Sequence, residues 1–221
     1  MDWKKNLFQN FKLYAVTDVR RDDRTILRRI EAVYRGGAEI VQLRSKELSF
    51  GELYRLGIAI RGLATRLRKL YFVNDHLDLA LATAADGLHV GQNDLPVAAI
   101  RSVLRRQGRS LIVGKSTHRI EEARRAIREG VDYIGVGPVY ATPTKPGRPG
   151  VGLRYVRQAA REVRIPFVAI GGIDLGNAAR VLEAGAGRLA VVRALFNAKA
   201  PEKAARDFVN LIQAKARKEG I

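Results

Sequence analysis

The sequence predicts a single (β/α)8 barrel, in which eight parallel strands alternate with eight helices. Short apolar runs rich in β-branched residues alternate with stretches of helical period, and eight such pairs follow one another. The 221 residues divide at about 27 residues per pair, near the lower size limit of this fold. The alternative is an open doubly wound sheet, whose first strand usually runs into a glycine-rich turn. Here the first predicted strand runs into Thr17-Asp18-Val19-Arg20, which favours the barrel.

The predicted strands are nearly continuous apolar runs. In chain order they cover residues 13–17, 40–43, 70–73, 87–90, 111–114, 133–136, 167–170 and 189–192. Runs such as Val168-Ala169-Ile170 lack the alternation of polar and apolar residues that a half-exposed strand shows. They indicate strands buried on both faces, as in a parallel sheet.

Helical periodicity follows each predicted strand. The expected helices cover residues 25–34, 51–68, 77–84, 97–107, 120–129, 153–162, 177–184 and 202–216. Ser49 and Glu52 have the spacing of a capping box before the second helix, and Asp174 is placed to cap the seventh. No linker or low-complexity segment interrupts the series, so we expect one domain over residues 1–221.

Composition narrows the class of protein. With 47% hydrophobic and 28% charged residues, the chain is neither disordered nor a membrane protein, and no apolar run approaches the ~18 residues of a spanning helix. The first residues lack the apolar core of a signal peptide. The absence of cysteine excludes a disulfide framework, a thiolate nucleophile and any cysteine-based metal site. We therefore expect a cytoplasmic protein that binds no membrane.

The net charge of +18 has three interpretations. The cations can lie on solvated helix faces, attract small anionic substrates, or bind nucleic acid. They are spread through every predicted helix, and no aromatic stacking motif accompanies them. This distribution argues against a specific nucleic-acid site.

Polar residues gather where the predicted strands end, which is where barrel enzymes carry their chemistry. The ends read Gln42-Leu43-Arg44-Ser45-Lys46, Asn74-Asp75-His76, His89-Val90-Gly91-Gln92-Asn93-Asp94 and Lys115-Ser116-Thr117-His118. All the histidines of the chain fall in these segments. A solvated strand end explains some of these polar residues equally well. Each group can therefore be either a ligand-binding site or an ordinary solvated strand end.

Asp75 and Asp94 are the candidate metal ligands. Each can be a plain helix N-cap, but two carboxylates at the ends of adjacent strands can also share a hard cation. Oxygen ligands on an open site suit Mg²⁺ that holds phosphates. A zinc site of His76, His89 and His118 is disfavoured, because no His-x-x-x-His spacing supports it.

Gly171-Gly172 is a candidate phosphate loop. Bare glycines let backbone N–H groups approach an oxyanion, a following helix adds its dipole, and loops seven and eight of a barrel commonly bind phosphate. Residues 137–150 form a long loop that we interpret as a lid or ligand clamp, with a stiff surface loop as the alternative. These residues predict a barrel enzyme that handles phosphorylated substrates with Mg²⁺.

Seven motifs follow one another in a fixed order. They are Leu13-Tyr14-Ala15-Val16-Thr17-Asp18, Gln42-Leu43-Arg44-Ser45-Lys46, Asn74-Asp75-His76, His89-Val90-Gly91-Gln92-Asn93-Asp94-Leu95, Ser116-Thr117-His118, Thr142-Pro143-Thr144-Lys145 and Ile170-Gly171-Gly172-Ile173. Together they resemble the thiamine phosphate synthase family, over nearly the whole chain. The resemblance implies a (β/α)8 barrel that joins a hydroxymethylpyrimidine diphosphate to a thiazole phosphate with Mg²⁺. The products are thiamine phosphate and diphosphate.

The resemblance also implies residue roles. The pyrimidine diphosphate would be bound by Gln42, Leu43, Arg44, Ser45, Lys46, Asn74 and Ser116, and Mg²⁺ by Asp75 and Asp94. The thiazole phosphate would be bound by Thr142, Pro143, Thr144, Gly172, Val192 and Arg193. Lys145, Ser116 and Arg44 would take part directly in catalysis, with Lys145 on the leaving diphosphate. The implied mechanism is dissociative: diphosphate leaves first, and the thiazole nitrogen attacks the pyrimidine methylene cation.

Two cations are unusual for this family. Arg193 stands where a small hydroxyl residue normally follows the valine, and it can bind the thiazole phosphate in a bidentate manner or narrow the site. Lys115 lies beside Ser116.

The nearest alternative function is that of the related thiazole tautomerase, which lacks the aspartate pair. A basic nucleic-acid-binding protein is the alternative from another class. The sequence leaves a homodimer open.

Overall fold

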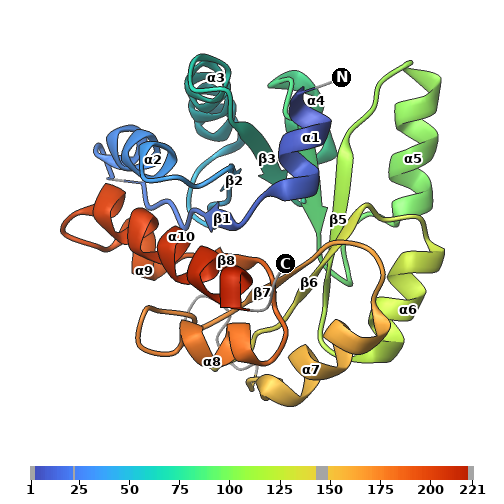
Figure 1. Ribbon diagram of the computed structural model, residues 1–221. Coiled ribbons are helices and arrows are strands. Elements are labelled where there is room, and N and C mark those ends of the chain that lie inside the picture. Colours follow the sequence, from blue (N-terminus) through green and yellow to red (C-terminus); the bar gives the residue numbers. More distant parts are fainter. Residues whose placement is uncertain (1–2, 22, 143–148, 219–221) are drawn as a thin grey trace.

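The computed structural model describes residues 3–21, 23–142 and 149–218, and it shows a closed barrel of eight parallel strands (Figure 1). The strands are β1 (Leu13–Val16), β2 (Ile40–Leu43), β3 (Leu70–Asn74), β4 (Gly87–Val90), β5 (Ile112–Thr117), β6 (Tyr133–Val136), β7 (Phe167–Ile170) and β8 (Leu189–Val191). They pair in chain order, and β8 closes on β1. The predicted fold class and all the predicted strands are confirmed. The largest shift is in β5, which continues to Thr117.

Helices surround the barrel and connect successive strands (Figure 1). They are α1 (Trp3–Asn10), α2 (Ile26–Arg35), α3 (Phe50–Arg66), α4 (Leu77–Ala82), α5 (Val97–Arg106), α6 (Ile120–Arg128), α7 (Gly152–Glu162), α8 (Ala178–Glu183), α9 (Arg193–Phe196) and α10 (Pro201–Lys218). The sequence did not predict α1 or α9, which are both short. In the part of the chain that the structure describes, no helix has the length and apolarity that crossing a membrane requires.

The predicted helix caps have different outcomes. The capping box is confirmed, because Ser49 Oγ accepts from Glu52 N and the Glu52 carboxylate accepts from Ser49 N. The predicted cap at Asp174 is wrong, since Asn177 holds the N-cap position of α8. Asp174 instead accepts backbone N–H bonds from Gly176 and Asn177. It therefore closes the turn that leads into the helix.

Two apolar cores lie on opposite faces of the strands. Successive side chains of a strand point to opposite faces, so in β2 Ile40 faces the barrel interior while Val41 and Leu43 face the surrounding helices. The inner core is mostly aromatic and aliphatic, with Tyr14, Leu70, Phe72, Tyr133 and Val168 among its members. Both faces being buried explains the nearly continuous apolar runs of the sequence.

Helix α1 fills the amino-terminal end of the barrel. Phe8 stacks on Phe11 at a ring-centroid distance of 5.7 Å, and both belong to the inner core. Phe8 also meets Tyr133 edge-on at 5.9 Å, and Phe11 meets Tyr14 edge-on at 6.2 Å. The aromatic side chains therefore close this end, which leaves the carboxyl ends of the strands as the accessible mouth.

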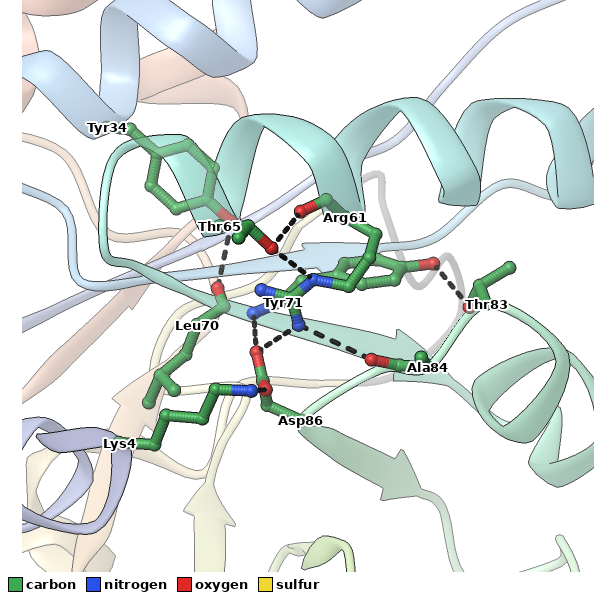
Figure 2. Close-up of polar contacts among 9 residues, drawn as sticks. All are labelled: Lys4, Tyr34, Arg61, Thr65, Leu70, Tyr71, Thr83, Ala84 and Asp86. Carbon is green, nitrogen blue, oxygen red and sulfur yellow. Dashed lines mark hydrogen bonds and ion pairs between the residues drawn. The ribbon is translucent and has the colours of Figure 1, made fainter. Parts of the chain in front are cut away.

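A buried carboxylate ties α1 and α3 to the same closed end. Asp86 directly precedes β4, and its carboxylate binds Lys4 Nζ at 2.7 Å, Arg61 Nη1 at 2.6 Å and the backbone N–H of Tyr71 at 2.9 Å. Figure 2 shows the arginine stretched between this carboxylate and the carbonyl of Ala84. This network holds the layers together at the end of the barrel opposite the mouth.

Candidate active site

A cavity of about 330 Å³ opens at the carboxyl ends of the strands. Its walls include Gln42, Arg44, Asn74, Ser116, Thr142, Gly172, Val192 and Arg193, all of them predicted substrate-binding residues. These residues come from six different strand ends, at β2, β3, β5, β6, β7 and β8. Closure of the barrel brings them to one mouth, as expected for the fold.

Three residues predicted on the segment after β2 do not face this cavity. Leu43 packs in the outer core with the helices. Ser45 stays in its own loop, where its hydroxyl donates to the Val19 carbonyl at 2.7 Å. Lys46 is exposed and is not among the lining residues that the structure describes. Strand alternation explains Leu43 and Ser45, because Gln42 and Arg44 point inward and their neighbours turn away. Lys46 lies beyond the end of β2 at Leu43, so alternation does not set its direction.

Arg44 is the cation best placed at the cavity wall. Its residue is buried to 8% exposure, and its guanidinium forms an ion pair with Asp18. Thr17 anchors the same segment, because its hydroxyl donates to the Arg44 carbonyl at 2.9 Å. The guanidinium is therefore held by β1 and β2 together. The sequence places Asp18 shortly after the first strand but does not indicate its pairing with Arg44.

The two predicted metal ligands follow adjacent strands. Asp75 comes directly after β3 with a left-handed φ of 62°, and its backbone N–H donates to the His89 carbonyl in β4 at 2.8 Å. Its carboxylate accepts from Asn74 Nδ2 at 2.5 Å. Asp94 lies in the loop after β4 and accepts from the Gly91 N–H at 2.6 Å. Both carboxylates thus stand on neighbouring loops, but neither is among the described residues that line the cavity, and Asp75 lines a separate pocket with Asp78 and Leu95.

This donor set fits Mg²⁺ rather than zinc. Among the residues that the structure describes, no group of three His, Cys, Asp or Glu side chains is placed to hold a metal. Two carboxylates without a protein cage match a magnesium ion whose remaining ligands are phosphate oxygens and water. The histidines are dispersed: His89 and His118 line the cavity, whereas His76 meets the Phe50 ring edge-on.

The glycine pair forms a tight wall on the side of β7. Gly171 and Gly172 have φ angles of 102° and 66°, which other residues rarely adopt. A Cβ on Gly171 would lie 2.4 Å from Pro138, and one on Gly172 would lie 2.7 Å from Tyr140 Cβ. The loop is also held by Asn177, whose amide donates to the Gly172 carbonyl at 2.8 Å. Only glycine fits here, because the segment after β6 packs directly against both residues.

The structure gives the remaining residues of interest different positions. Pro143, Thr144 and Lys145 lie outside the described residues, and Thr142 lines the cavity beside them in sequence. Arg193 lines the cavity with an exposed side chain. Lys115 is different, because it points to the helical layer and pairs with Glu129 at 2.7 Å. Lys115 therefore does not add a cation to the cavity.

A chain of buried polar groups crosses the bottom of the cavity. Gln42 Nε2 donates to the Tyr14 hydroxyl at 2.6 Å, and that hydroxyl lies 2.9 Å from the hydroxyl of Tyr133. His89 Nδ1 lies 2.9 Å from the Tyr133 hydroxyl, and His89 Nε2 lies 2.9 Å from Ser116 Oγ. Sequence reasoning missed the two tyrosines, which read as ordinary strand residues. No local signal distinguishes them, because their inward phase, shared with Gln42 and Ser116, is set only by the pairing of the strands.

Burial raises the pKa of both tyrosines well above the ordinary value of 10.0. At Tyr14 the loss of hydration outweighs the opposing hydrogen bonds from Tyr133 and Gln42. At Tyr133 the neighbouring Tyr14 adds to the effect of burial. Each hydroxyl therefore keeps its proton throughout the physiological range.

The closed barrel and the polar cavity at the carboxyl ends of its strands define the class of protein: it is a TIM-barrel enzyme. Residues 13–195 match the family described as thiamine monophosphate synthase. The thiamine-phosphate synthase of Thermus thermophilus is 51% identical over 181 residues, which are 81% of this chain and 85% of that protein. The Synechocystis enzyme of the same name is 44% identical over 196 residues, which are 89% of this chain but 55% of that longer protein.

Solved structures agree. Thiamine phosphate pyrophosphorylase from Pyrococcus furiosus superposes with a TM-score of 0.84 at 34% identity, covering 93% of this chain and 96% of the other. A 3-hexulose-6-phosphate synthase superposes with a TM-score of 0.67 at 18% identity over 90% of this chain and 99% of the other, which reflects the fold alone. The chain belongs to the thiamine monophosphate synthase family. It is a transferase of thiamine biosynthesis with the synthase activity of that family.

Proposed function

We propose that this cavity binds the pyrimidine diphosphate and the thiazole phosphate together and aligns them for condensation to thiamine phosphate. The observation that carries the proposal is the convergence of predicted residues from six strand ends on one cavity. Residues so far apart in sequence share a mouth only because the barrel closes. That arrangement suits a reaction in which two bound substrates must meet.

The diphosphate side of the site uses fixed cations and amides. Arg44, held by Asp18, stands ready to bind phosphate oxygens, and its planar guanidinium suits a bidentate contact. Gln42 and Asn74 line the same wall and supply further hydrogen bonds. Ser116 contacts the pyrimidine ring from β5, and Lys145 follows the diphosphate as it leaves. These groups act mainly by binding charge and orienting the leaving group.

Asp75 and Asp94 would hold Mg²⁺ beside the diphosphate. A bound magnesium ion supplies charge stabilisation to the leaving phosphate oxygens. The chain itself contributes the two carboxylates, with Asn74 and the Gly91 N–H orienting them. The support is the oxygen-only donor set on adjacent loops, which leaves the other positions to substrate and water.

The thiazole phosphate is assigned to the loops after β6, β7 and β8. Gly172 brings the backbone to the cavity wall without a side chain, and Val192 and Arg193 form the neighbouring wall. Thr142 completes this side, and the assignment includes Pro143 and Thr144, which lie outside the described residues. Arg193 is the direct ligand of the phosphate in this assignment, since it is an exposed cation among the lining residues of the cavity.

The reaction proceeds by departure of the leaving group before attack. The methylene carbon–oxygen bond breaks, and diphosphate leaves with the electron pair. The thiazole nitrogen then donates its lone pair to the pyrimidine methylene cation, which forms the new carbon–nitrogen bond. No protein nucleophile is needed, which agrees with the absence of cysteine. The work of the protein is to hold charge and exclude water.

The test is product formation by the purified protein. Protein supplied with both substrates and Mg²⁺ should release diphosphate and thiamine phosphate in equal amounts, and EDTA should abolish both. Omission of the thiazole phosphate should prevent thiamine phosphate formation. Failure of folded protein to release diphosphate with Mg²⁺ would refute the proposal. The thiazole substrate can be a thiazole phosphate or the same compound carrying an additional carboxylate. Supplying each form in turn identifies the one that the protein prefers.

Wider properties complete the proposal. The chain acts as one domain over residues 1–221, in the cytoplasm, on small phosphorylated substrates and without specific nucleic-acid binding. The large positive charge assists the approach of these anions, so kcat/KM should fall with ionic strength. The sequence leaves a homodimer open, and light scattering on the purified protein distinguishes it from a monomer.

A further inference from the structure

The buried polar chain beneath the cavity links two groups that both face the ligand. Gln42 stands at one end and Ser116 at the other, and both line the cavity. Between them lie Tyr14, Tyr133 and His89, joined by contacts of 2.6 to 2.9 Å. Tyr14 and Tyr133 are only 1% and 0% exposed, so solvent cannot replace any of their partners.

Each hydroxyl of this chain has one hydrogen to give, which fixes the direction of the bonds. Gln42 Nε2 can only donate, so the Tyr14 oxygen accepts and the Tyr14 hydrogen passes to Tyr133. The Tyr133 hydrogen must then go to His89 Nδ1. A neutral His89 consequently carries its hydrogen on Nε2, where it donates to Ser116 Oγ. The Ser116 hydrogen is left to point into the cavity.

The reverse direction is unfavourable for the same Gln42 orientation. A hydrogen on His89 Nδ1 would force Tyr133 to donate back to Tyr14, which already accepts from Gln42. The Tyr14 hydrogen would then be buried with no acceptor, and an unmade buried hydrogen bond is costly. The opposite direction of the hydrogen bonds therefore needs a rotated Gln42 amide. Rotation would turn Gln42 from an acceptor into a donor toward the cavity, and Ser116 from a donor into an acceptor.

We propose that His89, Tyr133 and Tyr14 are positioning residues that make Ser116 a hydrogen-bond donor and leave Gln42 Oε1 as an acceptor toward the ligand. The site then recognises a ring that offers a donor to Gln42 and an acceptor to Ser116. An aminopyrimidine has this pattern, because its amino group donates and its ring nitrogens accept. An oxo analogue, with an acceptor in place of the amino group and a donor on the adjacent ring nitrogen, has the opposite one. The assignment of the ligand rests on the proposed function, whereas the direction of the chain does not.

Nitrogen-15 NMR of the free protein tests the direction directly. At a pH where the imidazoles are neutral, His89 should show a bare Nδ1 and a protonated Nε2. The His89 signals are assigned as those that disappear in the His89→Gln variant. Tyr133→Phe keeps the ring but removes the link, so the His89 nitrogens should move toward an average of the two tautomers. Tyr34→Phe is the matched control. Tyr34 is equally buried, but its hydroxyl donates to the Leu70 carbonyl outside this chain (Figure 2).

Kinetics test the consequence for the ligand. In Tyr133→Phe the KM for the pyrimidine diphosphate should rise about 10-fold, as expected for one weakened hydrogen bond, while the KM for thiazole phosphate stays unchanged. The preference for the amino over the oxo analogue, measured as a ratio of inhibition constants, should narrow by a similar factor. Tyr34→Phe should change neither quantity.

The outcomes separate this proposal from the proposed function. A wild-type His89 with its hydrogen on Nδ1 overturns the proposal, as does a Tyr133→Phe variant that changes both KM values equally or neither. A wild-type protein that forms no thiamine phosphate refutes the proposed function, but the NMR result still decides the direction of the chain.

Discussion

Replacing Asp86 with alanine should destabilise the protein without altering its ligand affinity. The carboxylate is 4% exposed and binds Arg61, whose side chain is 14% exposed, and Lys4, whose side chain is 42% exposed. Removing one partner of a buried ion pair costs about 3–5 kcal/mol, whereas a half-exposed pair contributes at most about 1 kcal/mol. The Arg61 guanidinium is already under-supplied, because its Nη2 has no partner among the described residues.

We take about 4 kcal/mol as the expected loss, since these contributions share one carboxylate and do not simply add. For a chain of this length that corresponds to a fall in Tm of about 8–16 °C in calorimetry. Lys4→Ala should lower Tm by only about 1–4 °C. Arg61→Met combined with Asp86→Ala should recover part of the loss, because no buried charge then lacks a partner.

A fall in Tm of less than 3 °C in Asp86→Ala (roughly 1 kcal/mol) would contradict this prediction. So would a double variant whose loss of Tm equals the summed losses of the two single variants, because the unpaired charge of Arg61 would then not be the cause of the instability. The KM values should stay at the wild-type level in either case, since Asp86 precedes β4 at the end of the barrel opposite the cavity.

Further predictions concern the site and the pH dependence of stability. Asp94→Ala should abolish turnover and leave Tm within a few degrees, and an active variant would remove Asp94 from the metal site. Arg193→Ser should raise the KM for thiazole phosphate about 10-fold, as for loss of a charged hydrogen bond; an unchanged KM means that Arg193 does not bind the ligand. Burial raises the pKa of Glu39 above its ordinary value of 4.5, although the hydrogen bonds donated by the backbone N–H groups of Lys12 and Leu13 oppose the shift. The contribution of Glu39 to folding stability is therefore present below its ordinary pKa and is lost as pH rises through the pKa of the folded state. Glu39→Gln keeps an acceptor without the charge, so the difference in Tm between variant and wild type should become more positive from about pH 4 to 7; a constant difference would contradict the assignment.

The sequence was sufficient to predict the barrel and the location of its mouth. Strand and helix positions follow from local periodicity, and eight alternating pairs leave few other architectures. Polar residues at strand ends such as Asn74 and Ser116 then fall at the same end by the rules of the fold. The capping box of Ser49 was equally predictable, because both of its partners lie within four residues of each other.

The direction of each side chain is where the sequence was insufficient. A strand buried on both faces has no polar alternation, so nothing local indicates that Gln42 faces the cavity while Leu43 faces the helices. The same ambiguity leaves the direction of Lys115 open in the sequence, whereas the structure pairs it with Glu129 on the outer side. Inward or outward phase is decided only when all eight strands pair in register.

Long-range contacts belong to the tertiary structure for a related reason. Tyr14 and Tyr133 are 119 residues apart, yet their hydroxyls lie 2.9 Å from each other because closure places β1 and β6 across a narrow interior. Neither residue is unusual in a strand, so no local pattern marks them as partners. Chain order and composition thus specify a (β/α)8 barrel with polar residues at its strand ends, and barrel closure decides which side chains meet beneath its cavity.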